Sequence, residues 1–209
     1  MKLQVAVLLA MLVMAVAQLG HGLSNDQSPE VVEKWFKEFH HAKPKLTKLH
    51  FYLNNLVSKM NPPPSAVVAQ ASTTATSPTR FGLVSVIDGP LTEEPGSKVI
   101  GYGQGTFAFS SQEETSALVT LNFVFTEGEY KGSTFSVLGR NPITQDYREI
   151  PIVGGTGDFR LATGIATATT YYVNTTAGDD IVEVHAVFHR YTLPHHDHDD
   201  LVENSYSEL

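Results

Sequence analysis

The sequence contains no cysteine. Disulfide bonds, thiolate metal sites and cysteine nucleophiles are therefore excluded. A secreted domain without disulfides needs another source of stability, and a closed β-barrel or a tight oligomer would supply it. The N-terminal segment, considered below, predicts that this chain is secreted, so this constraint applies to it.

Positive charge is also scarce. The 209 residues include 14 Lys and Arg against 22 Asp and Glu, which gives a formal net charge of −8. A chain with this balance repels phosphate backbones, so we expect no nucleic-acid partner. With 42% hydrophobic and 17% charged residues, the composition indicates a folded core, and the length suits a single domain.

Only one apolar run is long enough to consider as a membrane or targeting segment. It spans Val5–Val16, follows Lys2, and ends in Ala-Val-Ala at 15–17. This predicts a secretory signal peptide over residues 1–22, cleaved after residue 17 or 22, with an uncleaved anchor as the alternative. Loss of Lys2 leaves 13 basic and 22 acidic residues, a charge of −9. We therefore expect an extracellular protein that does not bind membranes after cleavage.

Two polar segments flank the predicted domain. Residues 23–45 form either a flexible leader or a short amphipathic helix that starts at Pro29. The apolar residues at helical spacing are Val32, Trp35, Phe36 and Phe39. Residues 192–209 are interpreted as a disordered acidic and His-rich tail rather than a metal site, although they contain the run HHDHDD at 195–200.

Between residues 46 and 191 the apolar pattern has a period of two, which is typical of β-strands. About eight strands follow one another through short turns, and no helical pattern separates them. Glycines at 101, 103 and 105 fall inside one strand, where a curved sheet needs bulges or corners. The pattern predicts an all-β fold, an eight-stranded antiparallel up-and-down barrel.

The stretch IVGGTGDF at 152–159 contains three glycines, as phosphate-binding loops do. It has no lysine, however, and a β-branched segment follows it instead of a helix, so a nucleotide-binding loop is excluded. The remaining interpretation is a glycine-rich bend that places Asp158 at the start of a strand. The alternative is that the Asp158 carboxylate only caps the turn.

Five long segments resemble the dirigent proteins of plants. They are FGLVSVIDGPLT, SKVIGYGQGTFAFSS, FVFTEGEYKGSTFSVLGRN, REIPIVGGTGDFRLATGIATATTYY and DDIVEVHAVFHRY. The resemblance covers about Leu46 to Tyr191. It implies a secreted eight-stranded barrel of the dirigent and allene oxide cyclase type. It also implies a homo-oligomer, usually a trimer and alternatively a dimer, located in the apoplast or cell wall.

The resemblance also implies a function. Dirigent proteins impose stereochemistry on the coupling of phenoxy radicals, such as those of coniferyl alcohol in lignan biosynthesis, which a separate laccase or peroxidase generates. No cofactor or metal of the protein's own is then expected. Two alternatives stay open: a cyclase or dehydratase that acts on a quinone methide, and a defence protein that binds a phenol without turnover.

On the same resemblance, Asp88 and Asp158 match acidic pocket positions and are expected to act as acid/base or hydrogen-bonding groups. The expected substrate pocket comprises Phe107, Phe109, Thr163 and Phe188. Many relatives carry tyrosines where Phe107 and Phe109 stand, and an arginine in place of Thr163. These departures predict a bulkier or less polar phenol than the usual one. The sequon Asn174-Thr175-Thr176 lies in a polar turn of a secreted chain, which predicts N-glycosylation of Asn174.

Overall fold

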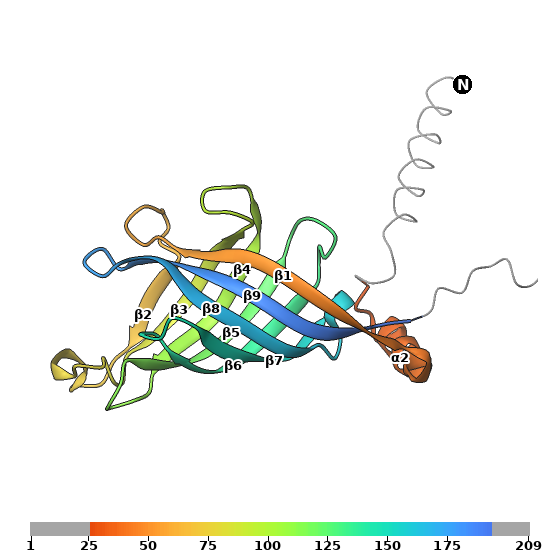
Figure 1. Ribbon diagram of the computed structural model, residues 1–209, viewed down its shortest axis with the longest axis horizontal. Helices are drawn as coiled ribbons and strands as arrows, with labels where there is room; N and C mark the ends of the chain where they lie inside the picture. The colour runs from red at the N-terminus through yellow and green to blue at the C-terminus, as the bar shows by residue number, and fades with distance from the viewer. Residues whose placement is uncertain (1–25, 194–209) are drawn as a thin grey trace, which may run out of the picture.

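The computed structural model describes residues 26–193, which form a closed antiparallel β-barrel with a short helix beyond one end (Figure 1). The predicted signal peptide and residues 194–209 of the predicted tail lie outside the described residues. Among residues 26–193, no helix is long and apolar enough to cross a membrane.

The predicted fold class, an all-β barrel of eight antiparallel strands, is confirmed. The closing strands are β1 (Lys43–Asn55), β3 (Val84–Thr92), β4 (Val99–Phe109), β5 (Ser116–Phe125), β6 (Thr134–Pro142), β7 (Arg148–Thr156), β8 (Thr163–Asn174) and β9 (Asp179–Thr192). Neighbours from β3 to β9 pair in chain order, β9 pairs with β1, and β1 meets β3. A ninth strand, β2 (Ser65–Ala69), pairs with β3 outside the closed ring.

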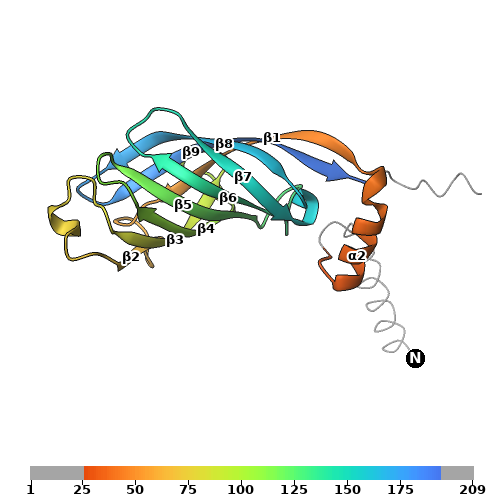
Figure 2. The same ribbon diagram turned by 90° about the horizontal axis from the view of Figure 1, so that it is seen from below.

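The segment before the barrel contains helix α2 (Pro29–Glu38) and the 3₁₀ turn η1 (Phe39–His41). Two further 3₁₀ turns are η2 (Thr74–Thr76) and η3 (Gly157–Phe159). No residue of α2 is buried, and the helix lies past the end of the barrel in both views (Figures 1 and 2). Of the two alternatives for the leader, the structure therefore contains the short helix that starts at Pro29. Strand β1 begins at Lys43, so residues 43–45 belong to the barrel rather than to the leader.

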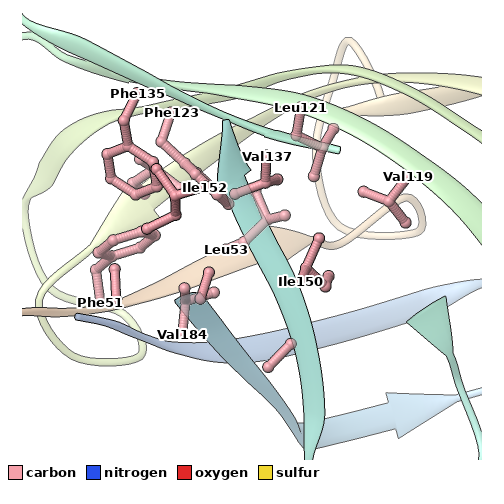
Figure 3. Close-up of a cluster of buried hydrophobic side chains, with 14 of the residues drawn as sticks. Phe51, Leu53, Val119, Leu121, Phe123, Phe135, Val137, Ile150, Ile152 and Val184 are labelled. Carbon is pink, nitrogen blue, oxygen red and sulfur yellow. The ribbon is translucent and has the colours of Figure 1, made fainter. Parts of the chain in front are cut away.

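The two ends of the barrel differ in character. We call one the Arg148 end, where β1 finishes at Asn55 and β9 starts at Asp179, and the other the Asp158 end, which carries η3. Inward-facing aromatic rings fill the middle and the Asp158 end: Phe51, Phe123, Phe125, Phe135, Phe159 and Phe188. The ring centroid of Phe135 lies 5.0 Å from that of Phe123 and 5.4 Å from that of Phe188. Figure 3 shows Phe51, Phe123 and Phe135 grouped apart from Val119, Leu121 and Ile150.

Phe135 is the centre of this aromatic packing and is fully buried. We expect Phe135→Ala to lower the free energy of unfolding by about 3–5 kcal/mol, because it removes a buried ring and leaves a cavity. Arg140→Ala on the outer face of the same strand, where the side chain is exposed and forms a surface ion pair with Glu114, should change it by no more than about 1 kcal/mol. Urea unfolding of both variants measures the contrast, and equal effects would contradict the assigned facing of β6.

Candidate functional site

The inward-facing side chains near the Arg148 end are slightly less buried than those at the Asp158 end. Ile87 and Leu121 face inward near that end and each keeps 8% of its surface exposed, whereas Phe135 and Phe159 keep none. Phe107 also faces inward there and is only partly buried against the core. The interior near the Arg148 end, where aromatic and aliphatic side chains pack least completely, is therefore the candidate binding region.

A buried cation stands inside this region. Arg148 has the same facing as Ile150 and Ile152, so its side chain enters the barrel. Its Nε donates to the Ala168 carbonyl (3.3 Å), and its Nη1 donates to the Ile143 carbonyl (3.1 Å) and to Thr170 Oγ1 (2.9 Å). Its Nη2 is buried and has no hydrogen-bond partner among the described residues. A buried, unpaired guanidinium donor is costly, so it is a natural place for an acceptor oxygen of a bound molecule.

A carboxyl group faces the same interior. Asp180 lies on the same face of β9 as the inward residues Val182 and Val184. Asn55 Nδ2 donates to Asp180 Oδ1 at 2.7 Å, and Ser65 Oγ donates to Asn55 Oδ1 at 2.7 Å. Burial raises the pKa of Asp180, although the Asn55 hydrogen bond and the positive charge of Arg148 oppose that shift. A carboxyl group with a raised pKa can hold and donate a proton, which makes Asp180 the candidate acid of this site.

The neighbouring carboxylate has a structural role. Asp179 is buried and accepts hydrogen bonds from the Ser58 amide (2.8 Å) and from Ser58 Oγ (2.6 Å). These bonds lower the pKa of Asp179, so it stays ionised. They also fasten the loop after β1 to the start of β9. This contact holds Asn55 and Asp180 next to each other.

The structure corrects the expected position of Asp88. Strand alternation turns its side chain to the outer wall, where it is exposed and accepts a 3.1 Å hydrogen bond from Gln104 Nε2. The inward position beside it is Gly89, which pairs with Gly103. A Cβ atom at either glycine would lie 2.9 Å or less from the Leu53 side chain. At Gly89 the added Cβ would also lie 2.9 Å from the Asn54 backbone oxygen, so glycine is favoured there, and no acidic side chain of β3 reaches the interior.

Asp158 lies at the opposite end from Asp180. It belongs to η3 and is half-buried, with its amide donating to Ser133 Oγ (3.0 Å) and that hydroxyl donating to its Oδ2 (3.2 Å). The predicted glycine-rich bend is present, because Gly157 has a φ of 63° that favours glycine. The structure thus places Asp88, Asp158 and Asp180 in three separate environments. The catalytic roles of the first two stay predictions.

The other predicted pocket residues divide between interior and exterior. Phe107 and Phe109 face inward near the Arg148 end, with ring centroids 6.2 Å apart. Phe188 is buried inside, in the aromatic packing of the Asp158 end. Thr163 is exposed on the outer wall, so the expected pocket position is corrected: the interior position next to it is Gly164, packed against Phe188. Asn174 ends β8 in an exposed turn, and its Oδ1 accepts from the Ala177 amide at 3.2 Å.

Three polar residues of the site were not predicted from the sequence: Asn55, Arg148 and Asp180. A signal for them was present. Arg148 shares its alternation with Ile150 and Ile152, and Asp180 shares it with Val182 and Val184. A charged residue in register with the apolar face of a strand is unusual enough to mark a functional group.

Comparison with known proteins gives the family and agrees with the fold. A family model described as dirigent-like protein matches residues 46–188. The chain belongs to the dirigent-like protein family. Dirigent protein 21 of Arabidopsis thaliana is 45% identical over 145 residues, which are 68% of this chain and 76% of that protein. Pterocarpan synthase 1 of Glycyrrhiza echinata is 45% identical over 150 residues, 69% of this chain and 79% of that protein.

Solved structures give the same family and fold. The pterocarpan synthase dirigent protein GePTS1 is similar to this chain with a TM-score of 0.65 and 40% identity, over 74% of this chain and 92% of that one. A second pterocarpan synthase dirigent protein, PsPTS1, gives a TM-score of 0.65 and 38% identity, over 71% and 97%. The match to this chain therefore extends over nearly the whole length of both solved relatives.

The raised pKa of Asp180 has a measurable consequence. The folded state binds a proton to Asp180 at a pH where the unfolded chain has lost it, so this carboxyl destabilises the fold as the pH rises above about 4. We expect the Asp180→Asn variant to gain stability relative to the unmodified protein between pH 4 and pH 7. Urea unfolding at several pH values measures this gain.

Asp179→Asn provides a control, because its effect on stability should depend on pH in the opposite direction. The lowered pKa of Asp179 contributes stability that is present at neutral pH and is lost in acid. This variant should therefore lose most stability at pH 7 and less as the pH falls. Parallel pH profiles for the two variants would contradict the assigned environments.

Proposed function

We propose that this dirigent-family protein directs the stereochemistry of bond formation between phenoxy radicals, which a separate laccase or peroxidase supplies. The observation that supports this most strongly is the apolar barrel interior, which carries one buried guanidinium donor without a hydrogen-bond partner at the Arg148 end. Coupling of two radicals needs orientation rather than a lowered barrier, and a shaped pocket supplies orientation.

The residues of the Arg148 end suit this role in distinct ways. The rings of Phe107 and Phe109 offer apolar faces against which a phenol can stack, each contact contributing on the order of 1 kcal/mol. The free Nη2 of Arg148 is placed to donate to a phenolic oxygen and so to fix which way the ring points. Each radical contributes its unpaired electron to one new carbon–carbon bond, so the coupling itself needs no further oxidant or reductant.

A second candidate function is a cyclase or dehydratase that acts on a quinone methide without an oxidase. Asp180 favours it, because ring closure needs a proton delivered to the methide oxygen and another removed from the attacking hydroxyl. The protonated carboxyl of Asp180 would give the first, and the resulting carboxylate would accept the second. Relatives named pterocarpan synthase, at 45% and 43% identity, support the idea that this barrel is catalytic.

Chiral chromatography separates the two functions. A laccase oxidises a panel of plant phenols with and without the purified protein, and a parallel set offers quinone-methide precursors without laccase. We expect an enantiomeric excess in the laccase set only when the protein is present. Product formed in the oxidase-free set would favour the second function. Racemic products in both sets, with a phenol still bound, would indicate a binding protein.

The three carboxyl groups make a matched series for that assay. Asp180→Asn should lower the enantiomeric excess or the yield at least tenfold, whereas Asp88→Asn on the outer wall should leave both unchanged. Asp158→Asn tests the role expected from the family resemblance, with loss of handedness in a folded protein as the supporting result. A large effect of Asp88→Asn alone would overturn the placement of the site inside the barrel.

We also propose that the protein is secreted, glycosylated at Asn174 and assembled as a homo-oligomer, most simply a trimer. The exposed position of Asn174 supports the second point. Exposed apolar side chains on the outer wall, including Leu118, Leu138 and Val153, support the third.

The oligomer can be tested on the outer wall. Leu118→Asp combined with Leu138→Asp should reduce the mass measured by light scattering to that of one chain. Tyr147→Ser, which changes an apolar residue in an exposed turn, should leave the mass unchanged. A monomeric unmodified protein would contradict the proposed assembly.

A further inference from the structure

A second cluster of polar side chains lies on the outer wall, away from the barrel interior. His50 of β1 and His185 of β9 stand directly opposite each other across an antiparallel pair. Both side chains face outward and are exposed. Their rings are stacked, with centroids 4.3 Å apart and planes inclined by 16°. Neither residue belongs to the site at the Arg148 end.

A carboxylate completes the group. Glu183 Oε1 lies 2.8 Å from His50 Nε2 and 3.3 Å from His185 Nε2. One ligand atom from each of the three residues lies within 4.8 Å of the other two. The Tyr52 hydroxyl, itself mostly buried, donates to the same Glu183 oxygen at 3.2 Å and fixes its orientation. Two neighbouring strands of a closed sheet therefore hold two imidazole nitrogens and one carboxylate oxygen toward a common point.

The distances suit a first-row divalent cation. Zinc binds histidine nitrogen at about 2.0–2.1 Å and carboxylate oxygen at about 2.0–2.2 Å, so ligand atoms around a tetrahedral ion lie roughly 3.3 Å apart. The measured separations of 2.8 and 3.3 Å need only small side-chain rotations to reach that value. A set of two imidazoles and one carboxylate favours zinc, nickel or copper(II) over calcium and magnesium, which prefer oxygen ligands throughout.

We propose that His50, Glu183 and His185 form a binding site for a divalent transition-metal ion of the zinc type. The three side chains supply three ligands, and the exposed side of the site leaves a fourth position for water. Tyr52 acts as a positioning residue, because its hydrogen bond orients the Glu183 carboxylate without occupying the metal position. The site is independent of the proposed coupling chemistry.

Isothermal titration of the untagged full-length protein with Zn²⁺ tests the proposal. We expect saturable binding at this site, weakened at least tenfold by His50→Ala and by His185→Ala. His189→Ala is the matched control, because His189 is exposed on the outer face of the same strand but outside the group, and it should leave the affinity unchanged. Tyr52→Phe should weaken binding severalfold while retaining the stoichiometry.

The histidines of residues 195–198 need a separate control, since they offer competing ligands. A variant with alanine at His195, His196 and His198 should keep the binding that His50→Ala removes. A Co²⁺ titration adds a spectroscopic readout, in which intense d–d bands of a low-coordinate ion should appear and should vanish in the His185→Ala variant. Zinc binding that survives the His50→Ala, His185→Ala double variant, or that depends only on the tail histidines, would overturn the proposal. Circular dichroism confirms that each variant is folded.

Discussion

The contact that closes the barrel is the constraint on which the rest of the structure depends. β1 meets β3 at only two paired positions, Tyr52 with Thr92 and Leu53 with Leu91. The closure works because Leu53 packs inward over Gly89 and Gly103, which have no Cβ atom to obstruct it. Without this contact the sheet would keep two free edges, and the interior would be one face of an open sheet instead of an enclosed space.

Closure also explains how the polar groups of the site are retained inside an apolar barrel. Arg148, Asn55 and Asp180 each have partners from a neighbouring strand or loop, and the Ser58–Asp179 hydrogen bonds hold that end in place. Burial of a charged group is unfavourable unless it is hydrogen-bonded, so this arrangement is maintained only because the surrounding backbone is fixed. The result is an interior packed with aromatic rings at the Asp158 end and carrying buried polar groups among apolar side chains at the Arg148 end.

The same closed sheet organises the outer wall. Alternation directs every second side chain outward, and the pairing of β1 with β9 places His50 beside His185 although the two residues are far apart in the sequence. The register of β1 against β9 therefore places one polar group inside the barrel, Asn55 with Asp180, and another on the outer wall, His50 with His185. A shift of one residue in the β1–β9 pairing would turn the inward-facing side chains outward and the outward-facing side chains inward.

The sequence by itself determined the strands, their order and the family, because a period-two pattern joined by short turns reports local geometry directly. It also located the glycine-rich bend at residues 152–159. It did not determine which side of the wall Asp88 and Thr163 occupy, since that depends on the register of each strand against its neighbours. Only the tertiary structure decided that Asp180 and Arg148 share the interior and that His50 meets Glu183 and His185. These groups come from segments far apart in the sequence, and the pairing of their strands in the folded sheet brings them together.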